Sequence, residues 1–108
     1  MVNYRRLKIP GATYFFTVTL RDRKSNLLIE HIDLLKISIK KVQQNLFYTT
    51  KAIVVLPDHI HTIWELPPRD DNFSLRWMKI KSYFTRSLIK RRISLDKNSR
   101  NEYNLFRT

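Results

Sequence analysis

The sequence KAIVVLPDHIHTIWEL, which spans residues 51–66, constrains the fold more than any other part of the chain. Residues 51–56 form a short continuous apolar run, and residues 59–66 resume an apolar pattern after Pro57 and Asp58. Two short runs rich in β-branched residues on either side of a turn signal predict two strands joined as an antiparallel hairpin. We expect both strands to be buried, although two histidines interrupt the second one.

The strand and the helix that precede this hairpin are indicated by their apolar periodicity. Residues 13–21 are rich in aromatic and β-branched residues and alternate with a period of two, which predicts a strand. The residues expected on its apolar face are Tyr14, Phe16, Val18 and Leu20. From Asp33, which we expect to be an N-cap, apolar residues recur at helical spacing. This stripe consists of Leu35, Ile39, Val42 and Leu46.

A second helix is expected after the hairpin. Ser74 is its predicted N-cap, with Phe73 and Met78 packed together as a hydrophobic staple. The buried stripe of this helix is expected to consist of Trp77, Ile80, Phe84 and Leu88. Towards the C-terminus, only residues 102–106 alternate enough to predict a weak edge strand.

The predicted order is strand, helix, strand, strand, helix and a weak last strand. This is the order of the ferredoxin-like, or RRM-like, α+β sandwich, in which an antiparallel sheet carries two helices on one face. The other face is then open, an arrangement found in proteins that bind single-stranded nucleic acid, but a fold alone does not assign a function. A weak last strand leaves one sheet edge unpaired, so pairing with a second copy in a homodimer is a further hypothesis.

The composition favours a polyanionic partner. The 108 residues, which we expect to form a single domain over residues 1–108, carry 21 Lys and Arg against 9 Asp and Glu, and a formal charge of +12. Nucleic acid fits this charge better than a small acidic metabolite, with a membrane surface as the competing polyanion. The sequence has no cysteine, no run of roughly 18 apolar residues and no signal-peptide pattern. We therefore expect a cytoplasmic protein without membrane attachment, disulfides or thiol chemistry.

The positive charge is concentrated after the hairpin. Residues 74–108 hold 10 of the basic and 2 of the acidic side chains. Uncompensated charges at this density repel one another and favour contacts with phosphates, whereas the alternative is a helix face that is only solvated. The basic residues expected to contact nucleic acid there are Arg76, Lys79, Lys81, Arg86, Lys90, Arg91 and Arg92.

The two histidines of the hairpin are the strongest candidates for chemistry. Side chains alternate along a strand, so His59 and His61 project from one face and Ile60 from the other. Two imidazoles on one rigid strand can hold a divalent transition ion and leave an open side for a substrate. The alternative is that two histidines beside a turn only form hydrogen bonds with neighbours or solvent. Residue types and spacing leave both interpretations open.

Three segments together point to a known family. LPDHIHTIW ends an apolar strand with a His-hydrophobe-His core, and NYRRLKIPGATYFFTVTLRDR, residues 3–23, contains Tyr-Arg-Arg followed by Gly-Ala-Thr-Tyr-Phe-Phe-Thr-Val. FSLRWMKIKSYFTR, residues 73–86, is a basic helical segment after the hairpin. In this order, over roughly residues 3–90, the chain resembles the single-tyrosine HUH transposases, and in particular the branch associated with repetitive extragenic palindromes.

The resemblance implies DNA strand-transfer chemistry. It implies that His59 and His61, with a third polar ligand, hold a divalent metal ion (Mg or Mn) against a scissile phosphate of single-stranded or hairpin DNA. A tyrosine would then attack this phosphate and give a covalent 5′-phosphotyrosine and a free 3′-hydroxyl. Arg5 and Arg6, in the Tyr-Arg-Arg motif, are expected to bind nucleic acid together with the basic helix.

The sequence departs from the family where the nucleophile is expected. The family's tyrosine lies on a further helix and is followed shortly by an Asn-Pro pair, and neither landmark is visible here. Tyr103 is the candidate in the corresponding late region, while Tyr83 is expected to be a partly buried residue of the second helix. The chain therefore resembles the first two-thirds of such a transposase, without its third metal ligand.

Two alternatives to a nicking enzyme follow from this departure. A shortened, catalytically inactive domain could bind nucleic acid without cleaving it, and this is the main alternative. A general RNA-binding domain with Tyr14, Phe15 or Phe16 as stacking residues ranks last, because its expected glycine-aromatic pattern is poorly met.

Overall fold

The computed structural model describes residues 8–95 and 105–107, so Arg5, Arg6 and Tyr103 lie outside the described residues. Three strands and three helices follow one another along the chain. They are β1 (Thr13–Thr19), α1 (Leu27–Glu30), α2 (Ile32–Asn45), β2 (Thr49–Val55), β3 (His59–Glu65) and α3 (Phe73–Lys90). No helix among these residues is long and apolar enough to cross a membrane.

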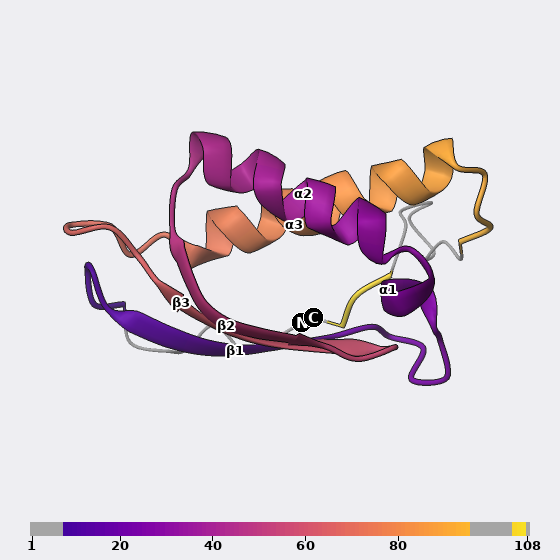
Figure 1. Cartoon of the computed structure of the whole chain (residues 1–108), viewed down its shortest axis with the longest axis horizontal. Helices are drawn as coiled ribbons and strands as arrows, with labels where there is room; N and C mark the ends of the chain where they lie inside the picture. Colours follow the sequence, from indigo (N-terminus) through magenta and orange to yellow (C-terminus); the bar gives the residue numbers. More distant parts are fainter. Residues whose placement is uncertain (1–7, 96–104, 108) are drawn as a thin grey trace.

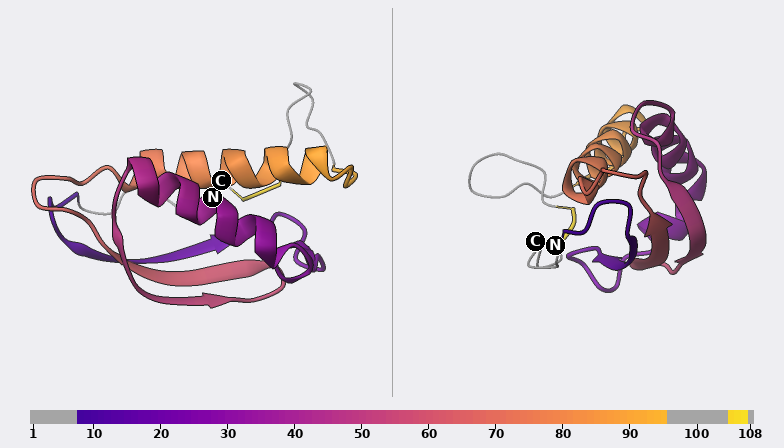
Figure 2. Two further views of the ribbon diagram at one scale, coloured as in Figure 1. Left: turned by 45° about the horizontal axis from the view of Figure 1, so that its top comes forward. Right: turned by 90° about the vertical axis from the view of Figure 1, so that its left-hand side faces the viewer.

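The sheet has the order β1-β3-β2, with β3 antiparallel to both neighbours. Helices α2 and α3 lie together on one face of the sheet, and no described helix covers the other (Figures 1 and 2). A short piece of a fourth strand lies beside β1, because Leu20 forms an antiparallel bridge with Phe106 and the Arg21 N–H donates to the Leu105 carbonyl at 2.9 Å. This arrangement confirms the predicted α+β sandwich. Of the predicted last strand, residues 102–104 lie outside the described residues.

The covered face of the sheet is built from large aromatic rings. The Phe16 ring lies 4.8 Å from that of Trp64, which stacks on Trp77 of α3 at 4.5 Å and on Tyr48 at 4.0 Å, measured between ring centroids. Aromatic pairs of this kind add to the free energy gained by removing apolar surface from water. The expected apolar faces of β1 and α3 are confirmed, since every one of these residues is buried: Tyr14, Phe16, Val18, Leu20, Trp77, Ile80, Phe84 and Leu88. In the expected stripe of α2, Leu35 and Val42 are buried, whereas Ile39 and Leu46 are half-buried.

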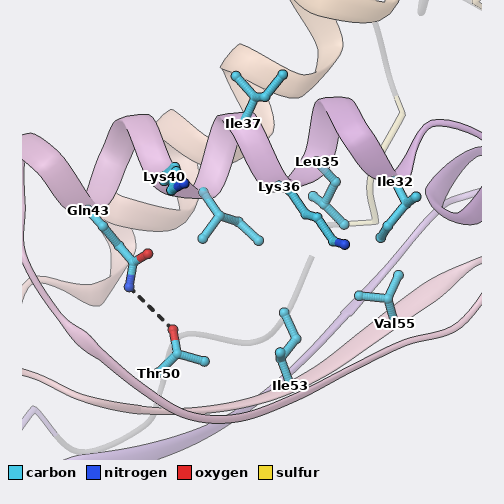
Figure 3. A pocket seen from close by; sticks show the side chains of 10 residues that line it. Ile32, Leu35, Lys36, Ile37, Lys40, Gln43, Thr50, Ile53 and Val55 are labelled. Carbon is cyan, nitrogen blue, oxygen red and sulfur yellow. Dashed lines mark hydrogen bonds between the residues drawn. The ribbon is translucent and has the colours of Figure 1, made fainter.

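Strand β2 contradicts the expectation that both hairpin strands are buried. Its residues are half-buried or exposed along their whole length, whereas β3 alternates with a period of two. The physical reason is that β2 is an edge strand and α2 does not pack tightly against it. A cavity of about 410 Å³ lies between the two elements, and Ile53 and Val55 face Leu35 and Ile32 across it (Figure 3).

Both predicted N-caps are wrong. Helix α2 begins at Ile32, and the carboxylate of Asp33, in the first turn, accepts hydrogen bonds from Arg91 instead of capping the helix. Helix α3 is capped by Asn72, whose side-chain oxygen accepts from the Leu75 N–H at 3.2 Å. The cap therefore comes two residues earlier than expected.

The predicted hydrophobic staple is also wrong. Phe73 is buried in the core, where its ring centroid lies 5.4 Å from that of Phe16, whereas Met78 is exposed. The two residues are five positions apart on α3, so they project from different sides of the helix.

Candidate active site

The candidate active site lies on the open face of the sheet, at the end where the β2–β3 hairpin turns. In β3 the buried residues alternate with the half-buried histidines, so His59 and His61 both face away from the helices. Their ring centroids are 4.8 Å apart, with the ring planes at 83°. The structure therefore brings the two imidazoles side by side, as the sequence predicted.

The ring of His59 is held by an acidic residue and a basic one. Its Nδ1 lies 2.9 Å from Oδ1 of Asp58, and the other carboxylate oxygen of Asp58 accepts from the guanidinium of Arg23. The Arg23 guanidinium and the His59 ring together lower the pKa of Asp58 to about 2. The carboxylate is therefore ionised and can only accept, so Nδ1 of His59 must be the donor. In the neutral ring this leaves Nε2 with a lone pair.

The ring of His61 is held by β1. Thr17 is the register partner of His61, and its Oγ1 lies 3.0 Å from Nδ1 of His61. The ring of Phe15, on the same face of β1, stacks on that of His61 with centroids 5.8 Å apart and planes at 19°. Both histidines thus have their Nδ1 atoms engaged by the protein, which fixes the direction of the rings.

These features fit a divalent metal ion that is bound in part by the described residues. Neutral imidazole with one nitrogen held by a second residue is the usual form of a metal-binding histidine. The part of the chain that the structure describes contains no group of three or more His, Cys, Asp and Glu side chains placed to hold an ion. Within those residues, His59 and His61 are the side chains whose placement would suit a shared ion.

No tyrosine among the described residues is placed as a nucleophile for this site. Tyr14 is buried, and its hydroxyl pairs with the backbone of Ile9. Tyr48 is buried against Trp64, and burial raises the pKa of its hydroxyl. Tyr83 lies in the helical layer, half-buried as expected.

The basic residues of α3 fall into groups that the sequence did not distinguish. Arg76 was expected to contact phosphates, and this is wrong because only 2% of it is exposed. Its guanidinium pairs with Asp70 at 2.8 Å and donates to the carbonyls of Leu46 and Phe47 at 3.0 and 2.7 Å. Arg76 therefore fastens α3 to the connection between α2 and β2.

Two further basic residues are less free than a bare charge count implies. Lys81 lies over the ring of Phe106, 5.5 Å from its centroid, and burial lowers its pKa to about 8. Arg91 forms an ion pair with Asp33 at 2.7 Å, so the expectation that the basic stretch is uncompensated is wrong at this residue.

The remaining basic residues of α3 lie in the helical layer. Lys79 borders a hollow of about 240 Å³ that α3 forms with α2, and Arg86 and Lys90 border a second one of about 110 Å³. Arg92, two residues after the end of α3, is exposed. The sheet separates the two hollows from the histidines, so the structure does not bring these cations to the candidate active site.

Three residues of the site escaped the sequence interpretation. Asp58 had been assigned only to the turn, although its place next to His59 was a usable signal. Thr17 shares a face with the histidines through strand pairing, which could be expected once the hairpin and β1 were predicted. Arg23 gave no signal, because it lies 35 positions from Asp58 in the sequence.

Similar proteins have been described at the level of both sequence and structure. A REP-associated tyrosine transposase of Escherichia coli (strain K12) is 49% identical over 85 residues, which cover 79% of this chain and 52% of that protein. A putative REP-associated tyrosine transposase of Haemophilus influenzae is 40% identical over 98 residues, which cover 91% of this chain and 56% of that protein. No family model matches the sequence.

A solved structure extends the similarity to the fold. It is described as a REP-associated tyrosine transposase bound to a REP hairpin, and it matches with a TM-score of 0.81 at 40% identity, over 99% of this chain and 58% of that chain. The chain thus spans about half the length of the relatives it matches, rather than the expected two-thirds. Over the part of those proteins that this chain spans, its resemblance to the REP-associated tyrosine transposases is confirmed.

Proposed function

We propose that this chain binds single-stranded or hairpin DNA and presents a scissile phosphate to His59 and His61 for nicking and strand transfer. The observation that carries the proposal is the pair of imidazoles on the open sheet face, 4.8 Å apart and each held through Nδ1. The solved relative was described with a REP hairpin, and the formal charge of +12 suits a nucleic-acid partner.

We propose that Nε2 of each histidine is a ligand of a divalent ion, Mg or Mn. When bound, such an ion polarises the phosphate and offsets the charge that develops on its oxygens. The protein's own part is orientation, because Asp58 and Thr17 hold the rings. Thr17 lies in β1, and Asp58 lies in the turn before β3, where its carbonyl accepts from the Leu20 N–H at 2.8 Å. A scissile phosphate placed in this way needs no further distortion before attack.

The nucleophile in this proposal is a tyrosine. Its phenol oxygen forms a bond to phosphorus while the bond to the 3′ oxygen breaks, which leaves a 5′-phosphotyrosine and a 3′-hydroxyl that takes up the proton. Tyr103 is the candidate that the sequence offers, and it stays a prediction. The covalent link retains the energy of the phosphodiester, so rejoining requires no nucleotide cofactor.

The test is to incubate the purified chain with Mn²⁺ or Mg²⁺ and a hairpin oligonucleotide that carries a single-stranded extension. We expect a protein–DNA adduct that is lost in His59→Ala and His61→Ala and that is retained in His31→Ala. His31 is the matched control, because it is the third histidine of the chain and hydrogen-bonds with Arg91 away from the open face.

A second candidate function is supported by the absence of a suitably placed tyrosine among residues 8–95 and 105–107. The chain would then bind DNA without cutting it. Binding without an adduct from any tyrosine would leave this function and exclude nicking by the chain as it stands. Binding should weaken steeply with salt, and Arg86→Gln with Lys90→Gln should reduce that dependence, whereas a salt-independent affinity would contradict the proposed phosphate contacts.

Three expectations from the sequence stay predictions. They are the DNA contacts of Arg5 and Arg6, the homodimer and the cytoplasmic location. Sedimentation of the chain with and without DNA tests the homodimer, for which β2 offers an edge that no other described strand pairs with.

A further inference from the structure

We propose that Phe15 is a stacking platform for an unpaired DNA base beside the histidine pair. This inference rests on the proposed function and deepens it, because it names the part of the open face that holds the single strand. Phe15 would then be a specificity-determining residue, since it favours unpaired nucleotides over a closed duplex.

The exposure of Phe15 sets it apart from its neighbours in β1. Its side chain is 53% exposed, whereas Tyr14 and Phe16 on either side are buried in the core. Phe15 therefore contributes little to the aromatic layer that holds the sheet to the helices. A large exposed ring is available for contact with a partner.

The strand register places Phe15 next to the histidines. Phe15 pairs with Ile63, and the next residue of β1 on the open face, Thr17, pairs with His61. Two residues along a strand span roughly 6.6 Å. The Phe15 ring therefore lies about one nucleotide away from the histidine pair. The Phe15 ring stacks on that of His61, with the planes at 19°, so one face of Phe15 is directed towards the histidine pair.

The surroundings of this surface suit a nucleic-acid strand. Thr13, Thr17 and Val54 share the open face and are uncharged. Glu65, at the far end of β3, faces Lys51 at 3.6 Å, and the carboxylate of Asp58 is paired with Arg23. An approaching phosphate thus meets no unpaired carboxylate among these residues.

Stacking on Phe15 requires a base whose face is free, which an unpaired nucleotide provides. An aromatic side chain can stack on any base whose face is free, and one such contact changes affinity by about 5- to 150-fold. In a duplex the faces of the bases are covered by their neighbours. Phe15 should therefore act on a single-stranded extension and leave the affinity for a blunt linear duplex unchanged.

The experiment measures DNA binding by fluorescence anisotropy, without metal, for the wild type, Phe15→Leu, Phe15→Trp and Phe47→Leu. The probes are a blunt linear DNA duplex and a hairpin that carries a short single-stranded extension with 2-aminopurine, whose fluorescence is quenched on stacking. Phe47 is the matched control, because it is 63% exposed and lies in the connection between α2 and β2. Thermal unfolding of each variant checks that it is folded.

We expect Phe15→Leu to weaken binding of the extended hairpin by about 5- to 150-fold and to abolish the quenching. Phe15→Trp should retain both properties, and Phe47→Leu should behave as the wild type does. If Phe15→Leu binds the extended hairpin as tightly as the wild type, with the same quenching, this inference is wrong while the proposed function stands. If the wild type does not bind the extended hairpin at all, the proposed function fails and the inference fails with it.

Discussion

The two faces of the sheet differ in what their residues do, although they are formed by the same strands. In β3, Ile60, Thr62 and Trp64 are buried under the helices. His59 and His61, which alternate with them along the strand, face outward. The covered face holds the fold together through aromatic packing, whereas the open face carries the groups suited to chemistry. Alternate residues of one strand therefore serve the stability of the fold and its proposed function.

The largest expected contrast is between Trp64→Ala and His61→Ala. Removal of the Trp64 ring opens a cavity between Phe16, Trp77 and Tyr48 and should lower the free energy of unfolding by about 3–5 kcal/mol. His61→Ala should change it by less than about 1 kcal/mol and abolish the adduct. Urea unfolding of both variants, with the adduct assay, measures the contrast. A destabilisation of His61→Ala comparable to that of Trp64→Ala would show that the open face is also part of the core.

The second contrast is between two arginines of α3. Arg76→Met removes a buried cation that holds Asp70 and three backbone carbonyls, and it should lower the free energy of unfolding by about 2–4 kcal/mol. Arg86→Met, at an exposed position, should change it by less than about 0.5 kcal/mol but weaken DNA binding. Parallel unfolding and binding curves separate the two roles. If Arg76→Met weakened DNA binding at full stability, the assignment of Arg76 to the fold would be wrong.

Replacement of Lys81 should raise the free energy of unfolding, whereas the replacements of Trp64 and Arg76 lower it. Burial lowers its pKa to about 8 from the ordinary 10.5, so the folded state disfavours its charge. The unfolded chain then binds more protons between pH 8 and 10.5, and the stability of the wild type should rise over that range. Lys81→Met should lack this rise and should be more stable than the wild type at pH 7. Unfolding curves from pH 7 to 10.5 test this, with Lys79→Met as the control.

The smallest effect is expected at Asp58, whose contribution to stability is lost only in acid. Its pKa of about 2 lies below the ordinary 3.8, so its pairing with Arg23 and His59 stabilises the fold above that ordinary value and is lost as the pH falls through about 2. Asp58→Asn should show a weaker decline in stability between pH 4 and 2 and an unchanged slope above pH 5. If stability declined equally between pH 4 and 2 in the wild type and in Asp58→Asn, the Asp58 carboxylate would not contribute to the stability of the fold.

The sequence predicted best where a local period decides the structure. The alternation of β1 and the stripe of α3 follow from spacing alone, and so does the shared face of the two histidines. The exposure of β2 could not be predicted, because an apolar run indicates burial only if both faces of the strand are covered. Its place at the edge and its distance from α2 are tertiary features.

The charged residues show a similar limit. The sequence shows that Arg76 and Arg86 are both basic residues of one helix, but only the fold shows that the first is buried against Asp70 and three carbonyls. The same holds for Arg23, whose partner Asp58 is distant in the sequence. Charge counts therefore overestimate the number of cations that are free to bind a phosphate.

β3, which carries the two histidines, is the middle strand of the sheet. Backbone hydrogen bonds to β1 on one side and to β2 on the other anchor this strand along its length. A shift of either ring by backbone movement would break bonds in both ladders at once. The imidazoles are thus preorganised in the absence of any ligand, and little conformational entropy remains to be lost when an ion and a DNA strand arrive.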